Sequence, residues 1–160
     1  MECDDKMHIK IIEVGKKSLI NKSLTFVDEG DFFTCSKKSW YLGSGYAYTT
    51  IDEKNIPMHK FILGEYDGVA DHINGNRLDN RRCNLRITDR KGNARNSKLR
   101  KDNKTGFKGV HFCTAKKKYK SFIWVDSKPI YLGYFDKPED AYSAYCAAAI
   151  KYHGEYARLR

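Results

Sequence analysis

The chain has 160 residues, of which 41% are hydrophobic and 13% aromatic, enough for one ordinary domain or two small ones, so disorder throughout is not expected. Its net charge of +10 is unevenly distributed. Residues 1–89 carry 13 Lys and Arg against 14 Asp and Glu, a net of −1, whereas residues 90–160 carry 17 against 6, a net of +11. The second part is therefore expected to bind a polyanion, the alternative being a lysine-rich soluble surface.

Cysteine usage and hydropathy indicate the compartment. The five cysteines are odd in number and form no C-x-x-C pair, so neither a disulfide framework nor a four-cysteine zinc site is expected, and a reducing compartment is favoured. The sequence has no apolar run long enough to span a bilayer. Residues 1–6 are acidic and lack the basic-then-apolar order of a signal peptide. We expect an intracellular protein with no membrane partner.

Short apolar runs separated by turn residues predict a small antiparallel sheet over residues 8–63. The expected strands are 9–14, 24–27, 32–35, 40–42, 46–51 and 58–63, the last with short helical content near 59–63; the expected breaks are 28–30, 43–45 and 55–57. Residues 69–73 and 85–88 are expected to pair as a hairpin around a long asparagine-rich loop. A polar helix is predicted from a cap at Thr88 or Asp89 to about Leu99.

Residues 98–106 are basic and nearly without apolar side chains, which predicts a charged, extended linker. Three strands are expected after it, at 107–112, 119–125 and 129–135. A helix then follows, with Asp136 as its cap, Pro138 in its first turn and Gly154 as its stop. An alanine-lined stripe on this helix is expected to pack across the three strands.

Asp71 and His72 stand side by side at the start of the asparagine-rich loop. An imidazole with a pKa of about 6.5 can take a proton from water, and a carboxylate is a hard ligand suited to Mg²⁺ or Mn²⁺. Neighbours on a regular strand point to opposite faces, so the two share a site only if the strand ends there, which residues 73–75 favour. The alternative is that Asp71 caps a turn and His72 is a surface histidine.

The motif can be written as Met58-His59-Lys-Phe-Ile, then Asp71-His72-Ile-Asn-Gly-Asn, then Asp79-Asn80-x-x-x-Asn84-Leu-Arg. Over about residues 38–98 the chain resembles the HNH nucleases of the ββα-metal fold, particularly phage and mobile-intron homing endonucleases. The resemblance implies that Asp71 and Asn93 hold one divalent metal, Mg²⁺ or Mn²⁺, that His72 is the general base, and that Asn84 orients His72.

The resemblance further implies that Asn80 ties the loop together and that His59 is structural or touches DNA. Many family members have histidine where this chain has Asn93, which implies a neutral, weaker ligand. The cysteine pairs that bind structural zinc in some relatives are absent, so no structural zinc is expected. Arg77, Arg82 and Arg86 are expected to contact DNA phosphates, the alternative being a solvated loop face.

Residues 106–160 resemble the AP2 DNA-binding domain. The matching strings are Gly106-Phe-Lys108-Gly109-Val110-His111, Lys118-Tyr119, Ile130-Tyr131-Leu132-Gly133-Tyr134-Phe135-Asp136 and Glu139-Asp140-Ala141 with the helix that follows. The resemblance implies a sheet laid in the DNA major groove. Matched positions are Lys108, His111, Lys118 and Tyr131, and strand alternation would send Lys120, Phe122 and Trp124 outward. Several arginines of that family are missing here, which implies a loose sequence preference.

Together these features predict an α+β fold: a small antiparallel sheet plus a ββα-metal HNH motif, followed by a three-stranded antiparallel sheet packed on one helix. The expected domains are a nuclease domain at 1–97, a basic linker at 98–105 and an AP2-like domain at 106–160. The expected function is a metal-dependent endonuclease of double-stranded DNA, encoded by a phage or mobile element in a host cytoplasm, acting as a monomer or weak dimer. The alternatives are a non-catalytic DNA-binding regulator, an RNA-binding basic protein, and a C-terminal module that binds protein.

Overall fold

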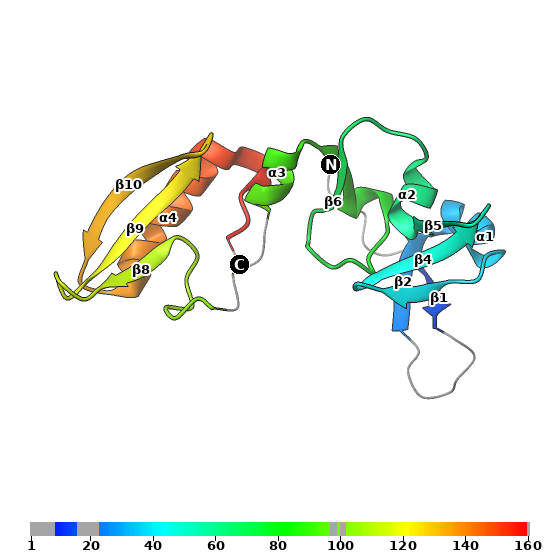
Figure 1. Cartoon of the computed structure of the whole chain (residues 1–160), viewed down its shortest axis with the longest axis horizontal. Coiled ribbons are helices and arrows are strands. Elements are labelled where there is room, and N and C mark those ends of the chain that lie inside the picture. The colour runs from blue at the N-terminus through cyan, green and yellow to red at the C-terminus, as the bar shows by residue number, and fades with distance from the viewer. Residues whose placement is uncertain (1–8, 16–22, 97–98, 100–101, 160) are drawn as a thin grey trace. The chain divides into compact units, whose positions relative to one another are not determined.

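The structure, a computed structural model, describes residues 9–15, 23–96, 99 and 102–159. The chain divides into two compact units, residues 1–89 and 90–160, and each combines helix with small antiparallel sheets (Figure 1). The division falls between Asp89 and Arg90 and not at the predicted linker, so helix α3 (Arg90–Arg95) belongs to the second unit. Residues 98, 100 and 101 of the predicted linker lie outside the described residues.

Three small sheets and two helices build the first unit. Its strands, in sheet order, are β1 (Ile9–Val14) with β2 (Ser23–Asp28), then β3 (Tyr41–Gly43), β4 (Tyr46–Ile51) and β5 (Lys54–Pro57), then β6 (Val69–His72) with β7 (Leu85–Thr88). Its helices are α1 (Glu29–Ser36) and α2 (Met58–Leu63), with a 3-10 turn at Arg82–Asn84. The predicted hairpin of 69–73 with 85–88 is confirmed, with Asp71 opposite Arg86 and His72 opposite Leu85.

Three predictions about the first unit are wrong in whole or in part. Residues 32–35 lie in helix α1 and not in a strand, and acidic Glu29 and Asp31 occupy its first turn, where they complement the helix dipole. Residues 58–63 were expected as a strand with short helical content near 59–63; they form helix α2 throughout, so the helical part is confirmed and the strand is not. The expected break at 55–57 lies inside strand β5, because Asn55 and Ile56 pair with β4.

The core of the first unit joins all of its layers. Its buried side chains come from β1, β2, both helices, β4 and β7, with Trp40 between them: Ile12, Val14, Val27, Cys35, Trp40, Ala47, Met58, Ile62 and Leu85. The Trp40 indole donates to the backbone oxygen of Cys35 at 2.8 Å, which closes the end of α1 over the core. Burial raises the pKa of the Cys35 thiol to about 11, so this cysteine packs as a neutral apolar group.

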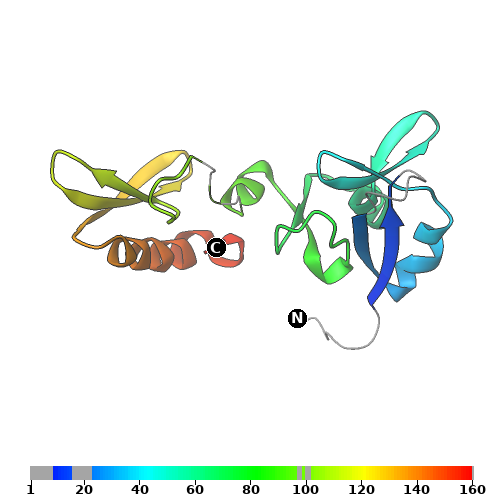
Figure 2. The same ribbon diagram turned by 90° about the horizontal axis from the view of Figure 1, so that it is seen from below.

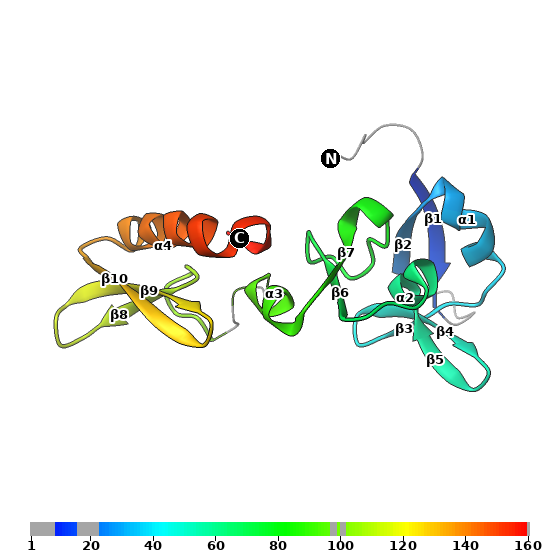
Figure 3. The same ribbon diagram turned by 90° about the horizontal axis from the view of Figure 1, so that it is seen from above.

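In the second unit, β8 (Val110–Cys113), β9 (Lys118–Val125) and β10 (Lys128–Phe135) form one antiparallel sheet with β9 in the centre. Helix α4 (Pro138–His153) lies along one face of this sheet (Figures 2 and 3). Buried Ile123 meets Tyr145, Ala148 and Ala149 there, so the predicted alanine stripe is confirmed. The three strands and the stop at Gly154 are also confirmed.

The start of α4 differs from the prediction. Lys137, and not Asp136, is the residue before the first turn, and no side chain caps the helix there. Asp136 instead lies 3.0 Å from the Lys118 ammonium. The predicted helix from 88 or 89 to about 99 is shorter, since α3 spans only six residues.

Three of the cysteines, Cys35, Cys113 and Cys146, are free thiols, and no disulfide framework had been expected. Cys83 is disulfide-bonded, which departs from that expectation. None of the helices in the described residues is long and apolar enough to cross a membrane.

Candidate functional site

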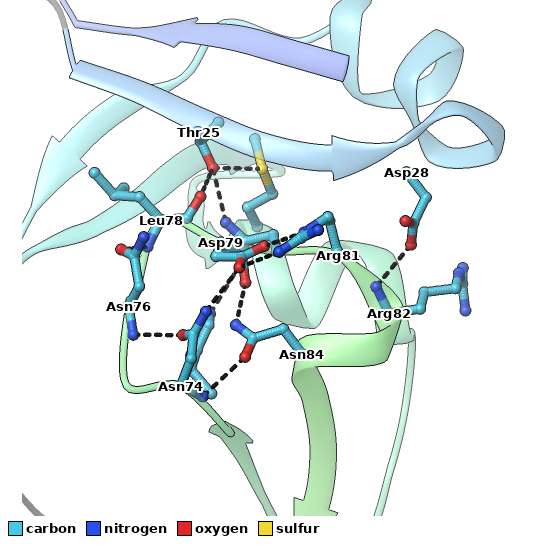
Figure 4. A network of polar contacts seen from close by, with 12 residues as sticks. Thr25, Asp28, Asn74, Asn76, Leu78, Asp79, Arg81, Arg82 and Asn84 are labelled. Atoms are coloured by element: carbon cyan, nitrogen blue, oxygen red, sulfur yellow. Dashed lines mark hydrogen bonds and ion pairs between the residues drawn. The ribbon is translucent and has the colours of Figure 1, made fainter. Parts of the chain in front are cut away.

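The asparagine-rich loop, residues 73–84, docks on strand β2. The Phe26 amide donates to the Leu78 oxygen and the Asn80 amide donates to the Phe26 oxygen, each at 2.8 Å. The Thr25 hydroxyl donates to the same Leu78 oxygen at 2.7 Å (Figure 4). Strand β2, which was expected only to form part of a sheet, therefore holds the loop in place, although the two are about fifty residues apart in the sequence.

Asp79 lies buried at the centre of the loop. Its carboxylate accepts from Arg81 at 2.8 and 2.9 Å and from the Asn74 amide at 2.8 Å. Burial opposes ionisation, but these bonds outweigh it and lower the pKa of Asp79 below its ordinary value. The carboxylate is thus ionised and holds the two ends of the loop together.

The other loop asparagines shape the turns (Figure 4). Asn74 and Asn76 each accept from a backbone amide two residues further along, the Asn76 amide at 2.7 Å and the Leu78 amide at 3.1 Å. Asn84 donates to the Asp79 backbone oxygen at 2.7 Å and accepts from the Asn74 amide at 2.9 Å. These contacts make a rigid loop beside the candidate base.

Asp71 and His72 end strand β6, and both are buried, at 7% and 5% exposure. Asp71 accepts two bonds from Arg86 on the facing strand, at 3.0 and 2.8 Å, both on its Oδ2 atom. Asp71 is also close enough to His72 for its charge to raise the pKa of the imidazole. The carboxylate and the imidazole are therefore electrostatically coupled as the last two residues of β6.

His72 is held by Asn80, whose Oδ1 lies 3.2 Å from its Nε2. The resemblance implied Asn84 in this role, but the Asn84 amide is committed to the loop backbone. Burial lowers the pKa of His72 below its ordinary 6.5, while the Asn80 bond and Asp71 act in the opposite direction. At neutral pH the ring is therefore neutral, as a proton acceptor must be.

Two aromatic neighbours enclose His72. The His59 ring from α2 meets it edge to face with centroids 5.3 Å apart, and the Tyr46 ring from β4 lies 5.9 Å away. Burial, followed by the proximity of His72, lowers the pKa of His59 to about 4. The His59 Nδ1 is buried without a hydrogen-bond partner. His59 thus contacts the candidate base directly.

The candidate metal ligands fall in different units. Asn93 lies in α3 of the second unit with an exposed side chain, so its pairing with Asp71 stays a prediction. In the part of the chain that the structure describes, no three His, Cys, Asp or Glu side chains are gathered to hold a metal. A single carboxylate still fits Mg²⁺, which binds through one or two carboxylates together with water and substrate phosphate. A carboxylate has two acceptor oxygens, so an ion pair on Oδ2 is compatible with a ligand role.

The three arginines expected to contact phosphate make different contacts. Arg77 is exposed, donates to the Ser44 oxygen at 3.0 Å and lies over the Tyr46 ring. Arg82 is paired with Asp31 through two bonds of 2.8 Å, and Arg86 is paired with Asp71. Arg77 and Arg82 are thus exposed, while Arg86 is half-buried between the strands of the hairpin.

The outer face of the second sheet carries aromatic and basic groups. Ser121 and Ile123 are buried against α4, and alternation turns Lys120, Phe122 and Trp124 to the other side. We call this surface the outer sheet face and define it by these members: His111, Lys120, Phe122, Trp124 and Tyr131. His111 stacks on Phe122 at 5.1 Å, the Lys120 ammonium lies 5.7 Å from the Phe122 and Tyr131 rings, and Trp124 and Tyr131 are more than half exposed.

Two lysines that were predicted to contact DNA bond to other residues of the second unit. The Lys108 ammonium donates to the Arg95 backbone oxygen at 3.0 Å, and burial lowers its pKa to about 8. Lys118 forms an exposed ion pair with Asp136. Lys108 therefore anchors the end of α3 in this structure.

Three contributions to the site were not predicted from the sequence: Thr25, Tyr46 and the pairing of Arg86 with Asp71. Thr25 and Tyr46 come from strands far from the motif, and no local pattern marks them. The Arg86 pairing follows from the hairpin register and could have been found by counting back from the loop.

Comparisons with protein-family models, with curated proteins and with solved structures each gave no match for this chain.

Proposed function

We propose that this protein is a metal-dependent endonuclease of double-stranded DNA, in which the first unit cuts and the second unit binds the target. The observation that carries the proposal is the buried Asp71–His72 pair at the end of β6, with a neutral imidazole held by Asn80. The resemblance of the motif to HNH nucleases, and of residues 106–160 to the AP2 domain, supports the same assignment.

In this proposal His72 is the general base, which takes a proton from the water that attacks the phosphorus. Its neutral form at pH 7 and its fixed orientation suit that role. The ring is enclosed by His59 and Tyr46, which limits its movement during proton transfer. Arg77, which lies over the Tyr46 ring, would neutralise a phosphate next to the scissile bond.

Asp71 would hold one Mg²⁺ or Mn²⁺, and the Asn93 donor that the resemblance implies stays a prediction. When bound, such an ion neutralises charge on the phosphoryl oxygens and stabilises the leaving oxygen. Arg86 fixes the Asp71 carboxylate by two bonds, which sets the direction of its oxygens before any ligand arrives. With one carboxylate in the ligand set, tight metal binding is expected only together with DNA.

The outer sheet face would contact DNA. Residues 90–160 carry the whole charge excess, and this face adds Lys120 and His111 to exposed rings that can pack on sugars and base edges. Residues 106–157 contain no arginine, so the planar guanidinium fork that reads guanine is missing there and the sequence preference is expected to be loose.

The alternative is a non-catalytic DNA-binding regulator. One observation favours it: Asp71 is already ion-paired with Arg86, as a structural carboxylate would be. Incubation of supercoiled plasmid with the purified chain separates the two functions. A nuclease converts the plasmid to nicked or linear form with Mg²⁺ and stops when the ion is chelated, whereas a binding protein shifts the plasmid on a gel and leaves it supercoiled in both conditions.

A further inference from the structure

A line of hydrogen bonds connects strand β2 to the candidate base. Asn80 is 1% exposed, and its Oδ1 lies 3.2 Å from His72 Nε2 while its Nδ2 donates to Thr25 Oγ1 at 2.9 Å. Thr25 is fully buried, and its hydroxyl donates to the Leu78 backbone oxygen at 2.7 Å. Figure 4 shows Thr25 reaching from the strand to the Leu78 oxygen.

The direction of each bond follows from the donors available. A hydroxyl has one proton, and the Leu78 oxygen at 2.7 Å takes it in preference to the weakly accepting Met58 sulfur at 3.6 Å. The Thr25 oxygen is therefore an acceptor toward Asn80. Asn80 must then turn its NH₂ group to Thr25 and its carbonyl oxygen to His72. A carbonyl oxygen only accepts, so the neutral ring carries its proton on Nε2 and its lone pair on Nδ1.

The backbone prevents the amide from drifting out of this line. The backbone N–H of Asn80 donates to the backbone oxygen of Phe26 at 2.8 Å, and Phe26 is the neighbour of Thr25 on β2. The other loop amide near the site, Asn84, is bonded at both ends to the loop backbone. Among the loop amides Asn80 thus has the contact that selects a tautomer.

We propose that Thr25 and Asn80 are positioning residues that hold His72 as its Nε2–H tautomer, so that Nδ1 is the atom that receives the proton from the attacking water. The catalytic part of this inference rests on the proposed nuclease function. The tautomer part does not, and it can be measured in a protein that cuts nothing.

The first test is nitrogen-15 NMR of the histidine side chains in the full chain at pH 7.5, with the His72 signals assigned by their loss in His72→Gln. The wild-type spectrum is expected to show a protonated Nε2 and an unprotonated Nδ1. In Thr25→Val the amide loses its acceptor and is expected to admit the other tautomer, whereas Thr25→Ser keeps a hydroxyl and restores the wild-type spectrum. Thr49→Val, a buried threonine of β4 that takes no part in the Asn80 contacts, is the matched control.

The second test is single-turnover cleavage at pH 7.5. Thr25→Val is expected to lower the rate about tenfold, the upper range for one hydrogen bond, with unchanged affinity for DNA. Asn80→Asp accepts from Nε2 but cannot donate to Thr25, so it keeps the tautomer.

An Nδ1–H tautomer in the wild type would overturn the proposal, whether or not the protein cuts DNA. So would a Thr25→Val protein that loses rate and thermal stability together while its His72 spectrum stays wild-type, since the role of Thr25 would then be structural. If Thr25→Val fails to fold, the wild-type and Asn80→Asp spectra decide the question. A wild-type Nε2–H tautomer in a chain without nuclease activity would support the positioning and reject the function.

Discussion

His59 makes the stability of the first unit depend on pH. Its imidazole titrates at about 4 in the folded chain and at its ordinary 6.5 in the unfolded chain, so the unfolded state binds more protons between these values. His59 therefore does not reduce the free energy of unfolding above pH 6.5, and it reduces this free energy progressively as the pH falls from 6.5 toward 4. With about 1.36 kcal/mol for each pKa unit, the loss is about 2 kcal/mol at pH 5 and about 3 kcal/mol at pH 4.

The perturbation is His59→Gln, which keeps a polar side chain and removes the titration. The assay is urea unfolding at pH 7.5 and pH 5, followed by fluorescence in a Trp124→Phe background, where buried Trp40 reports the first unit alone. Between pH 7.5 and pH 5, we expect the free energy of unfolding to fall by about 2 kcal/mol more in the parent protein, which has His59, than in the His59→Gln variant. His111→Gln, an exposed histidine of the second unit, is the control and is expected to change nothing. Equal pH dependence with and without His59 would refute the buried, depressed imidazole.

Three further predictions concern the second unit and the site. In chemical denaturation, Gly109→Ala should destabilise the second unit by about 3 kcal/mol or more. Its φ is +74°, and a Cβ there would collide with the Tyr145 ring and approach the Phe122 oxygen to 2.9 Å. The control is Gly106→Ala, which has a φ of +76° but open space around it and should cost about 1 kcal/mol. DNA affinity measured by fluorescence anisotropy should fall steeply with salt, and Lys120→Ala should reduce the slope of log K against log salt by about one; a flat salt response would contradict polyanion binding by the second unit. Asp71→Asn should stop Mg²⁺-dependent cleavage with DNA binding retained, as should chelation of the wild type, and cleavage that survives both would exclude Asp71 as a ligand.

Much of the fold could be predicted from local sequence patterns. The second sheet and α4 follow from alternation, turn residues and an alanine stripe, all of which are local signals. Residues 32–35 and 58–63 are short apolar runs, and such runs do not distinguish a strand from a helix. What decides is the partner: α1 covers β1 and β2, and α2 presents Met58 and Ile62 to the core.

The candidate site could be predicted in composition but not in its contacts. Asp71 and His72 are the last two residues of β6 and both are buried, and the turn residues after Ile73 indicated where this strand ends. The loop contains several asparagines with the same side-chain chemistry, so the sequence spacing does not predict which one contacts the imidazole. In the structure Asn80 contacts the imidazole and Asn84 contacts the backbone. That choice depends on Thr25, which belongs to a strand outside the motif.

Catalysis by His72 is decided by single-turnover cleavage of a duplex DNA that the wild type and His72→Ala bind with equal affinity, in Mg²⁺ at pH 7.5. We expect cleavage by the wild type, an acid limb with its midpoint below pH 6.5, and a reaction about a thousandfold slower for His72→Ala, within the range seen for loss of a general base. Cleavage by His72→Ala at the wild-type rate would contradict the assignment of His72 as the base and, with it, the proposed nuclease site.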